Sequence, residues 1–448
     1  MPRKIPEFPS QWQQPAVEAS HSYQIQLITP MFGGGVEAGV NDRRFPIRPT
    51  AIRGQLQFWW RATVGAQFET VEKLREEQSA IWGSTERASR VQVRVDEVRA
   101  IAPQPCAKYM TGSDGKFRLI WHNPFSNESR DLPYALFPFQ GQADRHVIKK
   151  EPASCILQAT FTLTLRFPNS ILPQVESAVW AWANFGGLGA RTRRGCGALF
   201  CKELAPNDEN DLATKWKHYM PAGSGLREWP TMAEYILVDK HPLNPIAAWG
   251  RVIGKMRHFR QGNDFARDPG HPPSRSRFPE PDTIRRITDS HMRGHEPREK
   301  IPDGFPRAEF GLPIVFHFKD ESKGEPRETV LLPFIPDLTS GGLRLDHEGH
   351  PIGTTKDRFA SPLILKPLAL ATDQSVATIL RLKTALPTKA ELQDNKSHEC
   401  LTFLRNVPVR DRSFASGQSP INGRSSSGSA LESFQAFALS EGFTEVKQ

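Results

Sequence analysis

The residues best suited to chemistry are the glycines and arginines of one short segment, residues 185–197. This segment reads Phe-Gly-Gly-Leu-Gly-Ala-Arg-Thr-Arg-Arg-Gly-Cys-Gly, so that five glycines surround three arginines. Glycine accepts positive φ and lets backbone N–H groups approach a ligand closely. Arginine presents a planar, permanently charged fork that pairs with phosphate oxygens. We therefore predict a backbone cradle for a polyanion, formed by Gly187, Gly189, Arg191, Arg193 and Arg194.

A nucleotide-binding loop is the first alternative, and the surrounding residues argue against it. No Lys-Ser or Lys-Thr follows the glycines, as a Walker A loop requires. A dinucleotide-binding loop follows a buried strand and opens a helix. Here a helical pattern at 172–184 precedes the loop, and a strand-like run at 198–202 follows it. A plain surface turn is the other alternative, but the three arginines favour RNA as the ligand.

A second basic set lies nearer the N-terminus. A glycine run at 33–35 leads into a polar loop, and a helix expected at 50–64 carries arginines at i and i+8 on one face. A tryptophan of this helix is a candidate for stacking on a base, with burial in the core as its alternative. For the arginines, solvation or internal ion pairing is the alternative. The candidate RNA contacts here, with one from a later helix, are Gly33, Gly34, Arg43, Arg44, Arg48, Arg53, Trp60, Arg61 and Lys255.

The elements that position these residues follow a recognisable order. Residues 21–29 predict a strand, residues 89–100 alternate over most of their length, and residues 155–167 form a long β-rich run. Together with the two helices and the short strand after the glycine loop, the order is β–α–β–β–α–loop–β. That order matches a ferredoxin-like split βαβ unit, the topology also used by RNA recognition motifs. A further strand is expected at 134–140.

A second unit of the same kind is expected after a linker at 206–229. It begins with a strand at 234–238 and a helix at 245–259, and a Pro/Arg-rich insertion follows at 261–298. Later strands are expected at 310–318, 329–334 and 362–371, and the Ser/Gly-rich run 413–429 is expected to be flexible. The predicted fold class is α+β, with two ferredoxin-like domains and long loops. The predicted divisions are a flexible arm at 1–19, a first domain at 20–205 and a second domain at 230–448 with a flexible C-terminal region.

Composition sets the broad class. The chain has 448 residues, a formal net charge of +9 and a pI near 9.3, so an anionic partner is plausible. No apolar run is long enough to span a membrane, and a soluble cytoplasmic protein is expected. The five cysteines are odd in number and lack a Cys-x-x-Cys pair, which predicts reduced thiols. We expect no cofactor and no metal.

Three stretches, 29–35, 47–61 and 185–197, together resemble the RAMP superfamily (repeat-associated mysterious proteins) of CRISPR systems. The likeness is closest to the family of the first subunit of the type III-B effector, the Cmr complex. Residues 274–285 and 358–366 resemble that family too. The resemblance implies two ferredoxin-like domains, a place at the end of the complex that holds the 3′ region of the guide RNA (crRNA), contact with neighbouring RAMP subunits, and no role in target cleavage. Target RNA is a further candidate partner.

Two other classes of function remain open at this point. Some RAMP proteins are endoribonucleases that process precursor crRNA, and metal-independent cleavage needs an acid and a base such as His with Lys or Tyr. Lys255 and His258 stand at i and i+3 on the second helix, whereas the helix at 50–64 contains no His, Lys or Tyr. A loop aspartate, Asp42, and the pair His291 and His295 are weaker candidates for metal-assisted chemistry. A scaffold that contacts only protein is the third class, with Phe32, Phe137 and Phe139 as docking aromatics on loops.

Overall fold

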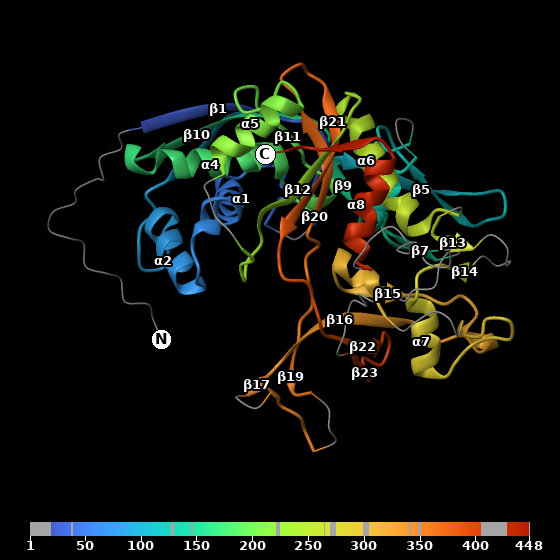
Figure 1. The fold of residues 1–448 in the computed structure, drawn as a ribbon. Coiled ribbons are helices and arrows are strands. Elements are labelled where there is room, and N and C mark those ends of the chain that lie inside the picture. The colour runs from blue at the N-terminus through green and yellow to red at the C-terminus, as the bar shows by residue number, and fades with distance from the viewer. Residues whose placement is uncertain are drawn as a thin grey trace, which may run out of the picture.

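The computed structural model describes residues 19–36, 39–126, 130–144, 147–220, 225–263, 265–268, 275–298, 304–339, 342–347, 351–404 and 428–447. The predicted arm at 1–19, apart from Ala19, and most of the run 413–429 lie outside these residues. No helix in the described part is both long enough and apolar enough to cross a membrane. The fold is α+β, built on two four-stranded antiparallel sheets and a third sheet of five strands (Figure 1).

The first sheet has the strand order β11-β1-β10-β3. Its strands are β1 (Ala19–Leu27), β3 (Gln92–Ala100), β10 (Ala159–Phe167) and β11 (Leu199–Phe200). Helix α1 (Pro49–Ala62) follows β1, and α4 (Leu172–Phe185) follows β10. Numbered within this unit, the order is 4-1-3-2, which is that of a split βαβ unit. The predicted order of elements is therefore confirmed.

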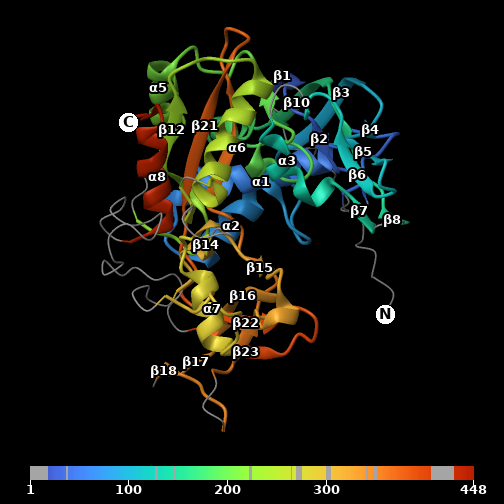
Figure 2. The same cartoon turned by 90° about the vertical axis from the view of Figure 1, so that its right-hand side faces the viewer.

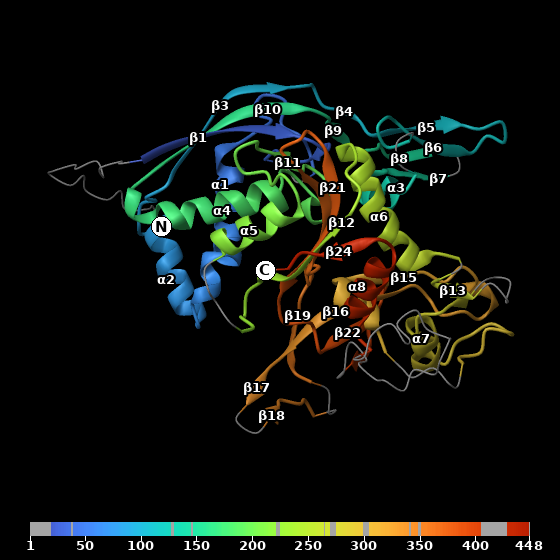
Figure 3. The same cartoon turned by 45° about the horizontal axis from the view of Figure 1, so that its top comes forward.

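Strict alternation in β1 and β10 explains why both helices cover the same face. In β1 the side chains of Tyr23, Ile25 and Leu27 are buried, whereas the residues between them are exposed or half-exposed. Antiparallel pairing places Ile25 opposite Phe161, so the apolar face is continuous across strands. Helices α1 and α4 lie together beneath this face (Figure 3). The opposite face of these two strands carries Ser, Thr, Gln and Arg side chains, and thus no aromatic platform of the RNA-recognition-motif kind.

The second sheet repeats the pattern, with the order β20-β21-β12-β24. Its strands are β12 (Thr231–Asp239), β20 (Leu363–Ala369), β21 (Ser375–Lys383) and β24 (Phe443–Glu445). Its helices, α6 (Pro245–Gln261) and α8 (Ala430–Ser440), follow the first and third strands, as α1 and α4 do in the first unit. The faint repeat seen in the sequence is thus a repeat of topology. The predicted domain boundaries themselves stay predictions.

A separate module is inserted in the second unit (Figure 2). It is formed by two stretches of chain, one between α6 and β20 and the other between β21 and α8. Its sheet has the order β15-β16-β22-β23, with β19 paired to β16. It has its own apolar cluster, which includes Ile284, Leu331 and Leu392. Its elements are α7 (Glu280–Thr288), β13 (Arg267–Asp268), β14 (Arg275–Ser276), β15 (Ile314–Phe316), β16 (Thr329–Pro336), β17 (Leu338–Thr339), β18 (Gly342–Leu343), β19 (Gly353–Thr355), β22 (Ala390–Asp394) and β23 (Cys400–Leu404).

Three expectations about local structure were wrong or incomplete, and one helix was not expected at all. The segment 134–140 is no strand, because α3 (Leu132–Leu136) and a 3-10 turn at Phe137–Phe139 occupy it. The expected linker contains α5 (Glu209–Tyr219), which begins at an Asp208 cap. The expected flexible C-terminal region includes α8, capped by Ser429. The helix α2 (Val71–Trp82) was not predicted.

The remaining short strands complete the list. They are β2 (Met31–Phe32), β4 (Gln104–Pro105), β5 (Ala107–Thr111), β6 (Phe117–Trp121), β7 (Gln142–Asp144), β8 (Val147–Lys150) and β9 (Ser154–Ile156). Of these, β2 pairs with β9, which fixes the start of the first glycine run beside β9.

Candidate nucleic-acid interface

The segment 185–197 leaves α4 and folds back on itself before β11. The amide of Leu188 donates to the carbonyl oxygen of Gly197 at 2.9 Å. Gly189, Gly195 and Gly197 all have positive φ, near 79°, 82° and 65°. A Cβ atom on Gly197 would collide with the carbonyl oxygen of Leu188. The glycines are therefore required for the close crossing of two backbone stretches.

The two glycine runs meet each other, as the fold requires them to do. The amide of Ala190 donates to the carbonyl oxygen of Phe32 at 2.7 Å. A Cβ atom on Gly189 would collide with that same oxygen. Arg48 holds the other end of the first run, because its guanidinium donates to the carbonyl oxygens of Gly34 and Gly35 at 2.9 and 2.6 Å. Gly34 thus packs beside Gly189 of the second loop, whereas Gly33 packs against Gly39.

These contacts revise the predicted backbone cradle. The amides of Leu188, Ala190, Gly195 and Gly197 donate to carbonyl oxygens of the protein, so they are not available to a ligand. Gly187 also serves packing, because its added Cβ would lie 2.6 Å from the carbonyl oxygen of Gly197. The anion-binding capacity of the loop must come mainly from its side chains.

Two of the three loop arginines tie the first unit to the second. Arg194 donates to the carbonyl oxygen of Leu363 at 2.9 Å, and Arg193 donates to that of Ser361 while lying 5.6 Å from the ring of Phe58. Burial lowers the pKa of both guanidinium groups from their usual value. The indole of Trp249 on α6 donates to the carbonyl oxygen of Arg194 at 2.6 Å. Both arginines are thus occupied at the junction of the two units.

A buried lysine reinforces the same junction and was missed by sequence reasoning. Lys366, at the centre of β20, is 1% exposed, and its ammonium group donates to the carbonyl oxygen of Gly186 at 2.8 Å. Burial lowers its pKa to about 7. The signal in the sequence was the apolar run of β20, in which one lysine interrupts otherwise core-type residues.

Arg191 is the loop arginine left for a ligand. It is half-buried and has a left-handed backbone, with φ near 58°. Its Nε atom is buried, with no hydrogen-bond partner among the described residues. Burial lowers its pKa, and Arg358 acts in the same direction, so the two positive charges lie near each other. A strained backbone that presents a half-buried cation is the arrangement expected at a functional site.

The two candidate arginines on α1 contact residues of α2. Arg53 donates to the carbonyl oxygen of Trp82, and Arg61 donates to the side chain of Gln78 at 3.0 Å, so both turn toward α2. Trp60 is fully buried and donates to Gln174 at 3.3 Å, so it presents no face to a base. Trp60 is therefore a core residue, which was the alternative to stacking on a base.

Lys255 is also occupied. Its ammonium group lies 2.6 Å from the carboxylate of Glu441 and is 18% exposed. The neighbouring His258 packs edge-on against Phe437. The structure therefore brings neither of these side chains to the glycine loops by any contact it records.

The loop between the first glycine run and α1 remains open. Arg43 and Arg44 are exposed, and the Arg44 guanidinium lies 5.4 Å from the centre of the Phe45 ring. Phe45 is 58% exposed, and sequence analysis did not single it out. The carboxylate of Asp42 accepts the amides of Arg44 and Phe45, and these two bonds lower its pKa. Asp42 therefore shapes the turn.

The metal hypotheses receive no support from the described residues. No group of three His, Cys, Asp or Glu side chains among them is arranged to hold a metal ion. His295 pairs with Glu325 at 2.6 Å, whereas His291 lies against the backbone of Met292.

A model of the RAMP superfamily matches residues 24–200, which contain the first sheet apart from the start of β1, both of its helices and both glycine runs. This part of the chain is similar to the RAMP superfamily. The resemblance inferred from the glycine and arginine stretches is thereby confirmed. Outside this RAMP region, the second unit repeats its strand order.

Similar proteins carry names from one CRISPR system. The chain is 26% identical over 184 residues to the Cmr subunit Cmr1-2 of Pyrococcus furiosus, a match that covers 40% of this chain and 92% of the relative. A crystal structure of Cmr1 from the same organism is 16% identical, covers 96% of this chain and 98% of its own, and has a TM-score of 0.47. A chain of a type III-B Cmr-beta complex bound to cognate target RNA is 13% identical, with coverage of 81% and 94% and a TM-score of 0.42.

Proposed function

We propose that this chain is a non-catalytic, RNA-binding subunit of a type III-B CRISPR effector in the cytoplasm. It binds the 3′ region of the crRNA and caps that end of the complex, beside neighbouring RAMP subunits. Its similarity to the RAMP superfamily over residues 24–200 and its similarity to Cmr subunits support this assignment. The observation that carries it is Arg191, a cation at the glycine loop whose buried Nε has no acceptor among the described residues.

The RNA contacts follow from which cations remain unoccupied. Arg191 supplies the central phosphate contact, with Arg358 near it. Arg43 and Arg44 add exposed charge on the neighbouring loop, and Phe45 offers a half-exposed ring for an unpaired base. Arg48 supports this loop from within. Because phosphate contacts carry no base information, guide binding should be independent of sequence.

Binding across a salt series tests the central contact. Loss of one arginine–phosphate contact is expected to weaken RNA binding about tenfold or more and to reduce the slope of log K against log salt by roughly one. The measurement is fluorescence anisotropy with labelled single-stranded RNA, the variant is Arg191→Ala, and the matched control is Arg94→Ala. Arg94 is exposed on β3 and pairs with Asp96 at 2.8 Å, so its loss should leave both quantities unchanged. Equal binding by both variants would contradict the assigned contact.

The position on the guide is tested in the assembled complex. A crRNA with a photoreactive uridine in its 3′ region should cross-link to this chain, whereas the same group placed in the 5′ region should not. The reverse pattern would remove the capping role and leave RNA binding intact. Incubation of labelled RNA in EDTA and in Mg²⁺ checks the absence of catalysis. Defined products that disappear with Lys255→Ala would replace the proposal with a processing nuclease.

A further inference from the structure

A second basic site lies in the inserted module, away from the glycine loops. A cavity of about 510 Å³ opens between the end of α6, the β13–β14 hairpin, α7 and β15. Three carboxylates line it: Asp282, Asp320 and Glu325. Six Arg or Lys side chains line it: Arg260, Arg267, Arg275, Arg285, Arg307 and Lys319. The lining therefore carries an excess of positive charge, to which His295 and His317 add when they are protonated.

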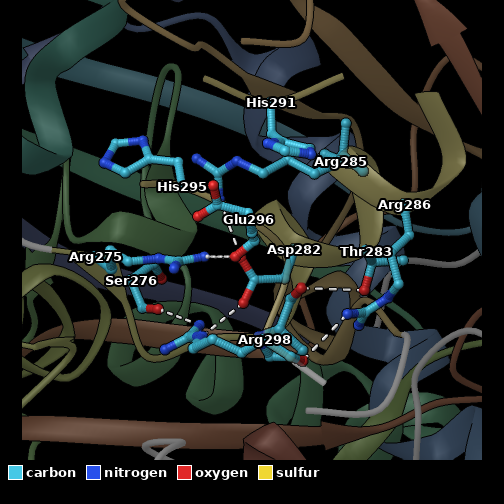
Figure 4. Close-up of polar contacts among 12 residues, drawn as sticks. Arg275, Ser276, Asp282, Thr283, Arg285, Arg286, His291, His295, Glu296 and Arg298 are labelled. Carbon is cyan, nitrogen blue, oxygen red and sulfur yellow. Dashed lines mark hydrogen bonds and ion pairs between the residues drawn. The ribbon is translucent and has the colours of Figure 1, made fainter. Parts of the chain in front are cut away.

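Arg275, Asp282 and Arg285 of the lining belong to a buried ionic network (Figure 4). The carboxylate of Asp282, 1% exposed, receives Arg275 at 2.8 Å, Arg285 at 3.0 Å and Arg298 at 2.6 Å. Burial acts to raise the pKa of Asp282, but Arg298 and Arg275 outweigh it and hold the pKa below its usual value. Three guanidinium groups thus share one carboxylate. Such a group leaves positive charge that only another anion can balance.

A second carboxylate balances this charge only in part. Glu325, 3% exposed, accepts from Arg285 at 2.9 Å and from His295 at 2.6 Å. Arg307 has a carboxylate of its own in Glu280, at 3.0 Å. In the described part of the chain, Arg285 is shared by Asp282 and Glu325, and Arg275 also lies near the carboxylate of Glu296.

Two donors at the cavity are unsatisfied. The Nε atoms of Arg275 and Arg260 are buried and have no hydrogen-bond partner within the part of the chain that the structure describes. Both side chains line the cavity. Buried donors of this kind are rare in folded proteins, and each one calls for an acceptor. A phosphate, with several oxygens on one centre, can accept from both.

Aromatic rings lie beside the cations. The Arg285 guanidinium lies 5.4 Å from the centre of the Phe318 ring, and that of Arg307 lies 5.7 Å from Phe316. Both rings line the cavity, together with the apolar Val315. Stacked guanidinium groups keep a fixed plane and direct their N–H edges at an anion. Rings next to phosphate donors suit a ligand that has an aromatic base attached to its phosphate, and the volume lies in the range of small-molecule sites.

We propose that this cavity binds a nucleotide phosphate, either as a free nucleotide or as the phosphate-bearing end of an RNA strand. The phosphate accepts from Arg275 and Arg260, and the base lies against Phe316 and Phe318. Lys319, exposed at the rim, attracts the anion. The site is independent of the contacts proposed for Arg191, so either assignment can fail without the other.

Calorimetric titration of the whole chain with AMP and with inorganic phosphate tests the site. AMP should bind measurably and more tightly than phosphate. Arg275→Gln should raise the dissociation constant at least tenfold, and Lys319→Glu should raise it several-fold. The control is Arg118→Gln on the β5–β6 hairpin, an exposed arginine 3.6 Å from Asp114, which should change nothing.

The outcomes distinguish a free nucleotide from an RNA end, and a wrong proposal from a variant that fails to fold. If a short RNA with a terminal phosphate displaces AMP, whereas the same RNA with hydroxyl ends does not, the site takes an RNA end. If neither RNA displaces AMP, it takes a free nucleotide. Because Lys319 is exposed, its variant should fold even if Arg275→Gln does not, and thermal melting checks both. Absence of AMP binding at millimolar concentration, or AMP binding unchanged by both variants, overturns the proposal.

Discussion

At the scale of the residue, identical side chains in one loop have different roles because their acceptors differ. Arg193 and Arg194 are occupied by carbonyl oxygens at the start of β20, whereas the buried Nε of Arg191 has no such acceptor among the described residues. The sequence predicted a basic glycine loop, but it could not show which of the three arginines bind protein carbonyl oxygens and which one does not. The acceptors of Arg193 and Arg194 belong to Ser361 and Leu363, which lie more than 160 residues away along the chain.

Gly189 should tolerate no side chain. Its φ is near 79°, and an added Cβ would collide with the carbonyl oxygen of Phe32. Gly189→Ala is therefore expected to lower the free energy of unfolding by roughly 2 kcal/mol or more, since it combines strain with a clash. The matched control is Gly54→Ala on α1, where nothing lies within 4 Å of the added Cβ. This control should be neutral or stabilising by about 0.5–1 kcal/mol. Thermal unfolding measures both, and equal melting temperatures would contradict the packing role.

Lys366 should make stability depend on pH. Its pKa is about 7 in the folded chain against an ordinary value of 10.5, so between these values the unfolded chain binds a proton that the folded chain lacks. The wild type should therefore gain stability as pH rises from about 7 to about 10, by at most about 1.4 kcal/mol per pH unit. Lys366→Met removes this gain, so the stability of the wild type relative to the variant should improve over the same range.

Urea unfolding at several pH values measures this difference. The control is Lys217→Met at an exposed position of α5, for which the difference from the wild type should stay flat with pH. A flat difference for Lys366→Met as well would show that its ammonium group stays charged in the folded chain.

At the scale of the element, hydrophobic periodicity predicted the helices and strands whose structure depends on the local sequence. The alternation in β1 and the 3–4 spacing in α4 gave the right structures, because each element buries one face along its whole length. The segment 134–140 misled, since its aromatic residues suit a strand, yet Pro133 and Pro138 start short helical turns there. The helix α5 was missed because its apolar face contains only Leu212 and Trp216 as buried residues. Polar helices of this kind leave little pattern to detect.

The short 3-10 turn Thr192–Arg194 works as a clamp between the glycine loop and β20. Arg194→Ala removes a charged hydrogen bond to Leu363 and is expected to cost about 1.5–3 kcal/mol of unfolding free energy. Its RNA binding should keep the wild-type salt slope, because this arginine faces protein. Arg191→Ala should show the opposite pattern, with a wild-type melting temperature and a shallower slope. Melting curves and anisotropy on both variants measure this, and a shallower slope for Arg194→Ala would show that the clamp also contacts RNA.

At the scale of the whole molecule, α1, α4 and the glycine loop of the first unit contact the sheet of the second unit, which has the same topology. A third module extends from the second unit (Figure 1). The repeat of split βαβ units was predictable from element order. The module was predictable only in part: the sequence suggested an insertion at 261–298 and strands at 310–318 and 329–334, but not a separate sheet. Its sheet combines β15 and β16 with β22 and β23, which follow β21, and such a pairing of distant segments leaves no local signal.

The module has its own core, so it should lose structure on its own. Leu331, fully buried on β16, contributes to a cluster that is separate from those of the two ferredoxin-like units. Leu331→Ala is expected to cost about 2–5 kcal/mol locally through lost packing and a cavity. Val315, on the neighbouring strand and 52% exposed, provides the control Val315→Ala, which should change stability little. Hydrogen exchange is the measurement. Amides of β15, β16 and β22 should lose protection in the Leu331 variant, while those of β10 keep theirs. Loss of protection in β10 as well would mean that the module and the RAMP region unfold as one unit, and the nucleotide site proposed in the module could then not be altered without affecting the RNA contacts at the glycine loop.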